Sequence, residues 1–587
     1  MKLRPGSIKN DRLLFIGSIL AFTVLIFDFG FRNNYWHQFL ADSFYLAYGL
    51  LFFVQMWRII RDAKVPARAL RASRYAILGA TALLVVLALL NLWEFVFLQK
   101  NFIRPTALLV LLLALLDISA RLYAIEKQTL HPALAFVLSF FILICIGTML
   151  LLLPLATKSG ISFIDALFTS TSAVCVTGLA VMDTGRDFTF FGQFVILMLI
   201  QLGGLGMLTF TNLFGLFFRG SGSYRNRLML KDMINATDMG DTFSTLVRII
   251  VFTFAIEAVG AVIIYYAVAP AMAGQEGRLF FAIFHAVSAF CNAGFSTLSN
   301  SLYEQGFRYN YSLHLAVAAL IILGGIGYSV FNNYYTYLKI LVRQNYHRLF
   351  RPGQDYVYRK PNISVNTRIV LFTTLSLLAV GTLAFYVLEY DNTLSGHSGW
   401  GKLATAFFGA VTPRTAGFNT VDTAALALPT LMIYFLLMWV GASPGSTGGG
   451  VKTTTFAISL MNIYQQVLGH DRIIFGWKQI PERALQRATA LILLSLIGIG
   501  GTVFSVMCFD GHLGLLPVAF ECISAYSTVG LSMGITASLS SASKLTIVLA
   551  MFIGRVSFLT LLIGIARQFV PRRHNPLRYP EEDILIN

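Results

Sequence analysis

Four glycines of this 587-residue chain share a local pattern that could place backbone carbonyls around an ion. Gly178, Gly294, Gly417 and Gly530 each follow a phenylalanine by ten residues and each precede Leu or Phe. The glycines lie 116, 123 and 113 residues apart along the chain. This spacing predicts four degenerate copies of one unit, in which a helix, a short pore helix, a glycine loop and a second helix follow one another.

The loops around these glycines could coordinate a dehydrated cation. A glycine permits backbone angles that a Cβ atom would penalise. If the chain returns from the short helix in an extended conformation, its carbonyls are free to replace an ion's water shell. The negative C-terminal end of each short helix would point toward the same ion. Because the five-residue loops contain no Asp or Glu, the pattern favours a monovalent cation as the only bound metal. The candidate filter residues are Val176, Thr177, Gly178, Asn292, Ala293, Gly294, Thr415, Ala416, Gly417, Thr528, Val529 and Gly530.

The composition indicates a membrane protein. Charged residues make up 12% of the chain, against about 25% in ordinary soluble domains, and the mean hydropathy is +0.71. Apolar runs such as 75–98 and 196–218 are long enough to cross a bilayer, which takes about 20 residues. A soluble enzyme, a nucleic-acid binder and a disordered scaffold are therefore disfavoured. Irregular loops at membrane depth are tolerated only where they line a pore or are buried in protein.

Hydropathy predicts an all-α polytopic protein with about twelve membrane helices. Four extra helices are expected before the repeats, at 13–30, 40–60, 75–98 and 103–123. Eight more are expected at 132–155, 189–218, 246–269, 311–340, 366–388, 428–460, 485–508 and 544–569. The chain then divides into an N-terminal segment (1–130) and four pore repeats at 131–235, 236–362, 363–470 and 471–587, the last with a cytosolic tail.

Basic residues predict the orientation. The net charge is +17, and Lys and Arg gather at 58–74, 219–231, 339–360 and 567–578. All four clusters fall on one side of the twelve-helix arrangement, which the positive-inside rule makes the cytoplasm. Both termini are then cytoplasmic, in a plasma membrane such as the bacterial inner membrane. The longest polar stretch, 341–365, is too short for a nucleotide-binding domain, and no nucleophile motif or compact His/Asp/Glu cluster indicates an enzyme.

The predicted span at 428–460 is too long and too rich in glycine for one straight helix. Residues 441–450 contain five glycines and Pro444; glycine disfavours helix, and proline removes a backbone donor. We predict a broken helix with an intramembrane loop, with a simple kink as the alternative. A phosphate-binding loop is disfavoured because Val451 separates the last glycine from Lys452 and no strand precedes it.

Charged residues inside the predicted spans are functional candidates, since such groups usually face a cavity or a partner. Arg555 has two interpretations: a fixed positive charge beneath the glycine loops, or a structural ion pair with Glu521. Lys452 could act in the same way or extend its amine to the membrane surface. Arg414 is expected to brace the third loop, with Glu521 as its partner. His285, aligned with Glu521 in the second copy, is expected to be a buried hydrogen-bonding group.

Several motifs together resemble the Trk/Ktr/HKT superfamily of K⁺ transporters, and most closely its Ktr-type membrane subunit. The resemblance covers about 130–587. It rests on the run Thr177-Gly178-Leu179, the pair Gly554-Arg555, and the segments 162–168 (SFIDALF), 201–206 (QLGGLG), 441–450 (GASPGSTGGG) and 579–582 (YPEE).

The resemblance implies a pseudo-tetrameric, K⁺-channel-like monomer with one filter built from the four loops. It implies a homodimer in the lipid bilayer, gated by a cytosolic ring of nucleotide-binding subunits, with no cofactor bound by this chain itself. K⁺ is the implied ion, with Rb⁺ as a substitute, because family members with Ser at the position of Gly178 lean toward Na⁺. A Na⁺-coupled or Na⁺-permeable transporter of the same fold is the alternative. The implied gate comprises Gly441, Ser443, Gly445, Gly448, Gly449, Gly450, Lys452 and Arg555.

Two features depart from the family pattern. The segment 1–130 adds about four helices that Ktr-type members usually lack. The tetrapeptide at 555–558 is Arg-Val-Ser-Phe, where the family more often has Arg-Val-Gly-Pro, and this puts the detail of the last inner helix in question.

Overall fold

The computed structural model describes residues 35–62, 78–89, 132–206, 242–272, 277–350, 363–470, 472–475 and 478–569, with isolated positions within 16–28 and 106–113. The predicted span at 13–30 is described only at scattered positions. The predicted span at 103–123 lies almost wholly outside the described residues. So do the end of the predicted span at 189–218, the basic segment 219–231 and the tail at 579–582.

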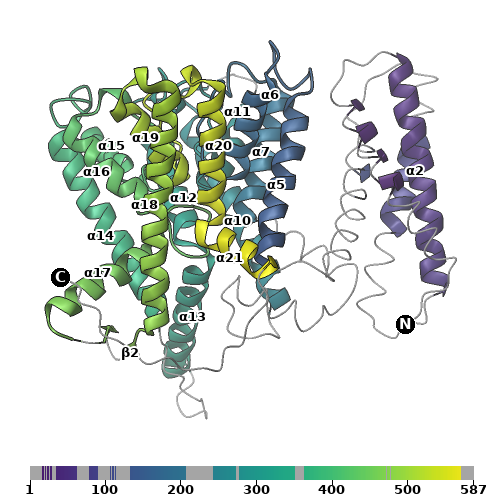
Figure 1. The fold of residues 1–587 in the computed structure, drawn as a ribbon. Helices are drawn as coiled ribbons and strands as arrows, with labels where there is room; N and C mark the ends of the chain where they lie inside the picture. Colours follow the sequence, from purple (N-terminus) through teal and green to yellow (C-terminus); the bar gives the residue numbers. More distant parts are fainter. Residues whose placement is uncertain are drawn as a thin grey trace.

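The described part of the chain is mostly helical, and its long helices stand side by side in one bundle with α2 beside it (Figure 1). The helices are α2 (Tyr35–Asp62), α5 (Pro132–Leu151), α6 (Phe163–Val174), α7 (Phe190–Leu205), α10 (Thr242–Ala267), α11 (Arg278–Phe290), α12 (Tyr311–Ile326), α13 (Tyr328–Phe350), α14 (Val365–Leu388), α15 (Gly399–Val411), α16 (Leu428–Trp439), α17 (Thr453–Val467), α18 (Glu482–Asp510), α19 (Leu515–Tyr526), α20 (Ser541–Val556) and α21 (Phe558–Phe569). Short 3-10 helices span Ser301–Tyr303, Thr423–Ala425, Gly511–Leu513 and Thr536–Ser538, and a small hairpin pairs β1 (Ile474–Phe475) with β2 (Lys478–Gln479).

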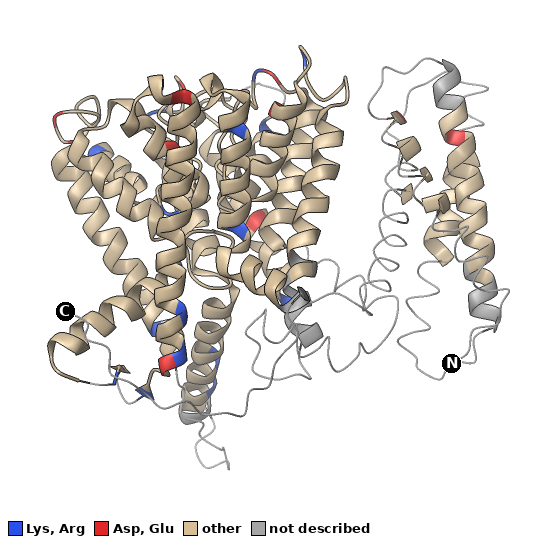
Figure 2. Ribbon diagram, viewed as in Figure 1, with Lys and Arg blue, Asp and Glu red and all other residues tan. Residues whose placement is uncertain are grey.

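The lengths and apolar character of several helices suit a bilayer. Within the described residues, Val247–Ala267, Val365–Leu388 and Glu482–Leu513 are long and apolar enough to cross it, and two bent helix pairs bring the number to five. Charged residues gather toward the two ends of the bundle, and few lie in its middle (Figure 2). The bundle therefore carries its polar groups where a membrane protein meets water.

Short helices α6, α11 and α19 each lie between two longer helices in the chain order, and the short helix α15 lies between the longer α14 and the similarly short α16. Two of them begin at serine caps, because Ser162 accepts from the N–H of Asp165 and Ser398 from that of Gly401. An ion pair of 2.8 Å between Asp165 of α6 and Lys544 of α20 joins segments 379 residues apart. The first and last units are therefore in direct contact.

Glycines bring the following helices against the ends of the short helices. A Cβ atom added to any of three glycines would lie within about 2 Å of a carbonyl oxygen of a short helix. The pairs are Gly203 with Val174 (2.0 Å), Gly324 with Phe290 (1.9 Å) and Gly554 with Tyr526 (1.8 Å). All three carbonyls lie four residues before a loop glycine. Gly203 and Gly324 therefore allow close helix packing, since no larger residue would fit without a shift of the backbone.

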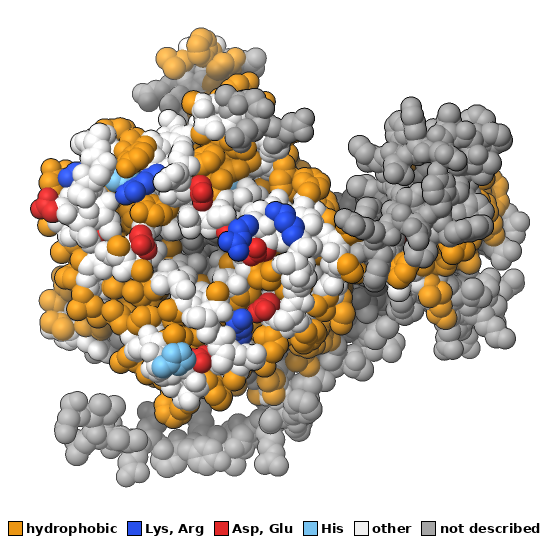
Figure 3. Space-filling model, turned by 90° about the horizontal axis from the view of Figure 1, so that it is seen from above, with side chains coloured by type: hydrophobic (Ala, Val, Ile, Leu, Met, Phe, Trp, Pro, Cys, Tyr) orange, Lys and Arg blue, Asp and Glu red, His pale blue; other side chains and the backbone are white. Residues whose placement is uncertain are grey.

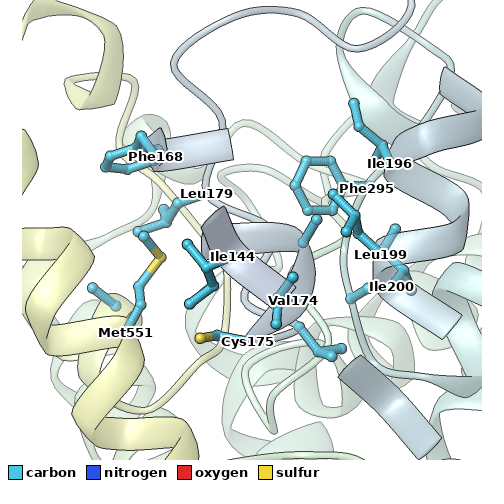
Figure 4. Close-up of a cluster of buried hydrophobic side chains, with 14 of the residues drawn as sticks. Ile144, Phe168, Val174, Cys175, Leu179, Ile196, Leu199, Ile200, Phe295 and Met551 are labelled. Atoms are coloured by element: carbon cyan, nitrogen blue, oxygen red, sulfur yellow. The ribbon is translucent and has the colours of Figure 1, made fainter. Parts of the chain in front are cut away.

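The first short helix is surrounded by a buried apolar cluster. Phe168 of α6, Ile144 of α5 and Ile200 of α7 are almost fully buried there, and Phe295 and Met551 reach the cluster from other units (Figure 4). The core is thus shared between units distant in sequence. It fixes α6 relative to the second loop and to α20.

Three of the predicted spans are interrupted. The span at 428–460 breaks between Trp439 and Thr453, as the glycines predicted. The predictions for 311–340 and 544–569 were wrong, because the chain bends by 92° between α12 and α13 and by 82° between α20 and α21. Gly327 makes the first bend with φ +80° and Ser557 the second with φ +73°, so the backbone turns through the left-handed region at both places.

Replacement of Ser557 by glycine should stabilise the protein. A residue with a Cβ atom pays about 1–2 kcal/mol for left-handed backbone, whereas glycine adopts it freely. Part of that gain is offset by the greater freedom of glycine in the unfolded chain, so we expect an increase of about 0.5–1 kcal/mol in unfolding free energy. Thermal unfolding of the purified protein measures it. Ser557→Ala keeps the Cβ atom and should give no gain; equal unfolding temperatures for Ser557→Gly and Ser557→Ala would contradict the assignment of strain.

Candidate functional site

The four loop glycines form a closed ring. A Cβ atom on each glycine would collide with the carbonyl oxygen before the next glycine: Gly178 with Ala293 at 2.4 Å, Gly294 with Ala416 at 2.8 Å, Gly417 with Val529 at 2.4 Å and Gly530 with Thr177 at 2.1 Å. The fourth contact returns to the first loop. Residues from four separate parts of the chain therefore meet around one axis.

The backbone of every loop has the same unusual conformation. Each glycine has positive φ, between +70° and +94°, and so does the residue two positions earlier: Val176 (+57°), Asn292 (+59°), Thr415 (+67°) and Thr528 (+52°). Side chains with a Cβ atom rarely occupy this region. Alternation of left-handed and ordinary backbone gathers N–H groups on one side of a segment and carbonyls on the other.

The hydrogen bonds show which side the N–H groups take. In the first loop, Thr177 donates to the carbonyl of Ser172 at 2.8 Å and Gly178 to its hydroxyl at 3.0 Å. The fourth loop repeats both bonds at 2.8 and 3.0 Å, with Ser524 as the acceptor. Within the described residues, no hydrogen bond uses a carbonyl of the twelve predicted filter residues. Those oxygens remain available to a cation.

The third copy is offset by one residue from the predicted alignment. Sequence placed Val411 and Phe407 at the positions of Ser172 and Phe168, but Thr412 supplies the hydroxyl, which donates to the carbonyl of Phe418. Phe408 is fully buried, whereas Phe407 is partly exposed. The third loop is one residue shorter between its hydroxyl and its glycine, and a gapless alignment on the glycine could not detect this.

Two opposite loops are braced at their outer ends by a side chain of the short helix. His285 Nε2 lies 2.9 Å from the Ser296 hydroxyl while Nδ1 lies 2.9 Å from the Phe281 carbonyl. Glu521, at the matching position of α19, accepts from Ser532 and, at 3.1 Å, from Thr536. The expectation that His285 is a buried hydrogen-bonding group is confirmed. Ser296 and Ser532 both lie two residues after a loop glycine, so the braces fix equivalent points.

A vestibule lies outside the ring. Its volume is about 460 Å³, and its walls include all four loop glycines together with Ser296, Ser532, Asp183 and Asp422. Figure 3 looks down on this face of the molecule. Hydroxyl, carboxylate and backbone oxygens there would meet a hydrated cation before it reached the ring.

The loop of the interrupted span lies against the ring from the other side. A Cβ atom on Gly448 would lie 2.2 Å from the hydroxyl oxygen of Thr415, and one on Gly449 would lie 2.2 Å from that of Thr528. The base of the loop is closed by two backbone bonds, from Gly441 to Val451 at 2.9 Å and from Val451 to Trp439 at 3.2 Å. Ser443 and Gly445 lie in the same loop, where Ser443 donates its N–H to the carbonyl of Gly325 at 3.0 Å. Gly450 ends it with φ +68°.

Two cationic side chains hold this loop. Arg555 of α20 donates to the carbonyl of Thr447 and, at 2.6 Å, to that of Gly203. Lys452 donates to the carbonyl of Gly448 at 2.5 Å. The proposed ion pair of Arg555 with Glu521 is wrong, because Glu521 is bonded to hydroxyls outside the ring. Thr447, which sequence reasoning did not single out, supplies the carbonyl that links the loop to α20.

Arg414 does not pair with Glu521 either. The arginine is 8% exposed, and its Nε has no hydrogen-bond partner among the described residues.

The sequence did not predict the hydrogen bond of 3.1 Å between Gln201 and the buried carboxylate of Glu257. Glu257 lies on α10 and Gln201 on α7, so only knowledge of helix packing could have paired them.

These features define a class of helical membrane protein in which short helices and glycine loops enter the bundle to form a ring above an interrupted span. The family model described as TrkH, a cation transport protein, matches residues 98–571. The chain belongs to this family. It is therefore an integral membrane ion transporter and not an enzyme.

Similar proteins support this assignment. The potassium/sodium uptake protein NtpJ of Enterococcus hirae is 36% identical, over 78% of this chain and 98% of that protein. The Ktr system potassium uptake protein B of Bacillus subtilis is 34% identical, over 77% and 96%. The crystal structure of the potassium transporter TrkH from Vibrio parahaemolyticus superposes with a TM-score of 0.55 at 17% identity, over 91% of this chain and 98% of that one. The last likeness concerns the fold alone.

The outer brace can be tested by replacing Glu521. Glu521→Leu leaves the hydroxyls of Ser532 and Thr536 without their acceptor, and a buried unpaired polar group costs about 1–3 kcal/mol. We expect a lower temperature of thermal unfolding for Glu521→Leu and a smaller loss for Glu521→Gln, whose amide oxygen can still accept. Equal losses for Leu and Gln would show that the brace depends on the charge of the carboxylate, which both variants remove, and not on an acceptor oxygen for these bonds.

Proposed function

We propose that this chain is the pore-forming subunit of a potassium uptake system, with the ring of loop carbonyls as its selectivity filter. K⁺ would enter from the outer vestibule, exchange its water shell for the carbonyls of the four loops and leave toward the cytoplasm. The filter would consist of Val176, Thr177, Gly178, Asn292, Ala293, Gly294, Thr415, Ala416, Gly417, Thr528, Val529 and Gly530.

One observation carries the proposal: the four loops combine paired left-handed residues with N–H groups tied back to the short helices. Because Ser172 and Ser524 engage the N–H groups of their loops, the carbonyls on the other side are left for a ligand. Carbonyl oxygens can replace the hydration shell of a monovalent cation. The C-terminal ends of four short helices add negative potential at the same place.

The repeat organisation supports the same function. We propose four repeats at 131–235, 236–362, 363–470 and 471–587, arranged as a pseudo-tetramer around one pore, after about four extra transmembrane helices in 1–130. The ion pair between Asp165 and Lys544 supports closure of the ring between the first and last repeats. We also propose that both termini lie in the cytoplasm, which the distribution of basic residues favours.

We propose that residues 441–450 form the gate. The loop lies directly beneath Thr415 and Thr528, where it would obstruct an ion that leaves the filter. Arg555 and Lys452 hold it closed through the carbonyls of Thr447 and Gly448, and their positive charges oppose a cation at that point. The gate residues are Gly441, Ser443, Gly445, Gly448, Gly449, Gly450, Lys452 and Arg555.

Control of the gate would come from a partner. We propose that the chain forms a homodimer in the bilayer and is regulated by a cytosolic ring of nucleotide-binding subunits, with the nucleotide on that partner and no cofactor on this chain. The name of the B. subtilis relative, protein B of a Ktr system, supports a multi-component transporter. The basic segment at 339–360 offers a charged cytoplasmic surface for such a partner.

A Na⁺-coupled or Na⁺-permeable transporter is a second candidate function. The E. hirae relative is named as a potassium/sodium uptake protein, and carbonyl filters of one fold can serve either ion. In both cases the membrane potential would drive uptake by about 2.3 kcal/mol per charge for each 100 mV.

Ion flux into liposomes separates the two candidates. Purified protein should take up K⁺ or ⁸⁶Rb⁺ under an inside-negative potential, with and without added Na⁺. Flux of Na⁺ without flux of K⁺ or ⁸⁶Rb⁺ would overturn the potassium proposal.

The same assay tests the filter through Gly178→Ser. A Cβ atom at Gly178 would lie 2.4 Å from the Ala293 carbonyl, so the ring must distort, and we expect the preference for K⁺ over Na⁺ to fall by about tenfold, equivalent to 1.4 kcal/mol. Gly160→Ser is a matched control, because Gly160 also has positive φ (+87°) but has no atom within 4 Å of the added Cβ. Unchanged selectivity in Gly178→Ser, or the same change in Gly160→Ser, would contradict the filter assignment.

Shortening the gate loop should increase flux. Deletion of residues 445–448 removes the carbonyls that Arg555 and Lys452 hold, so we expect faster K⁺ uptake in the absence of the regulatory partner. The measurement is the initial rate of K⁺ uptake per protein molecule in liposomes, compared between the variant and the unmodified protein. Gel filtration first shows that the variant is folded. Slower uptake by the folded variant would refute a barrier at this position.

A further inference from the structure

The guanidinium of Arg414 lies inside the bundle and forms no ion pair with any residue that the structure describes. The residue is 8% exposed, and it lies three residues before Gly417. Its Nε has no hydrogen-bond partner among the residues that the structure describes. An arginine remains protonated in proteins, and an uncompensated buried charge is strongly unfavourable.

The side chain borders a small cavity beside the third loop. The cavity holds about 20 Å³, and its other walls include Ile321 and Gly325 of α12, Thr374 and Leu378 of α14, and Ala442. Arg414 is the one charged residue among those that line it. Thr374, which is 5% exposed, places a hydroxyl in the same lining. The lining thus includes one charged residue and one residue that carries a hydroxyl, among walls that are otherwise apolar.

We propose that this cavity binds a small monovalent anion of halide size, held by the Arg414 guanidinium and the Thr374 hydroxyl. Both groups can donate hydrogen bonds to an anion. The volume exceeds the 10–15 Å³ that a single water needs, so the cavity has room for a small ion. A water molecule alone would leave the charge of Arg414 uncompensated.

The anion would also change the field at the third loop. An isolated positive charge near Gly417 raises the energy of any cation in the ring, since Coulomb interactions are strong where water is excluded. A halide beside Arg414 cancels most of that field. This binding site does not depend on the proposed potassium function, because an anion would stabilise the fold whichever cation is transported.

Anion-dependent thermal unfolding tests the proposal. Purified protein is heated at constant K⁺ concentration in chloride, bromide, sulfate or gluconate. A ligand that binds only the folded state raises the unfolding temperature, and we expect about 2 °C in chloride and bromide relative to gluconate. Sulfate should give no such increase. Arg414→Met should unfold at the same temperature in chloride and gluconate.

Arg278→Met is the matched control. Arg278 donates to the carbonyl of Tyr265 at 2.9 Å and does not line the cavity, so the variant should keep the full difference between chloride and gluconate. The proposal is overturned if the wild type shows no halide effect, or if Arg414→Met keeps it.

Bromide in crystals gives an answer that does not require the variant to fold. Anomalous scattering from the unmodified protein in potassium bromide should show a peak against the Arg414 guanidinium. The absence of a peak there, with clear peaks elsewhere, would overturn the site.

Discussion

The structure depends on the close approach of each loop's carbonyl to the glycine of the neighbouring loop. These contacts leave no room for a Cβ atom at Gly178, Gly294, Gly417 or Gly530. They also require left-handed backbone twice in each loop, which persists only where the surrounding structure holds it. The short helices supply that support through the hydroxyls and carbonyls that bind the loop N–H groups. The helices that follow pack onto the same short helices through glycines, so the ring and the bundle constrain each other.

Buried charges follow a different rule on the two sides of the ring. Outside it, carboxylates are satisfied by neutral donors: Glu389 accepts from the hydroxyls of Thr393 at 2.9 Å and Thr430 at 2.6 Å, as Glu521 does from Ser532. Inside it, Arg555 and Lys452 are satisfied by carbonyls of the interrupted span. Glu389 and Glu521 therefore lie toward the proposed entrance, and Arg555 and Lys452 lie at the proposed barrier. In the proposed pore, these four groups would attract a cation to the vestibule and oppose its exit past the loop.

Sequence predicted the features that glycine and hydropathy encode. The four loop glycines and the interruption at 441–450 were found because a glycine cluster is costly in a helix and a repeated spacing is rarely accidental. Contacts between distant segments were not accessible in this way. Glu521 was predicted as a partner of Arg555, yet Arg555 binds two backbone carbonyls. Every residue has a carbonyl, so the sequence does not indicate which ones accept a hydrogen bond. The third loop was misaligned by one residue: the alignment placed Val411 opposite Ser172, but the hydroxyl that binds the loop belongs to Thr412. The bends at Gly327 and Ser557 were both missed, because a single glycine is tolerated within a helix and serine rarely adopts positive φ.

The central claim is that the ring binds a dehydrated monovalent cation through its carbonyls. Anomalous diffraction from crystals grown in Rb⁺ tests it most directly, because Rb⁺ replaces K⁺ and is located without reference to transport. The account predicts peaks on the axis between the four loops, bordered by the carbonyls of Thr177, Ala293, Ala416 and Val529. An empty ring with Rb⁺ bound elsewhere, or Rb⁺ held only by side chains of the vestibule, would contradict it.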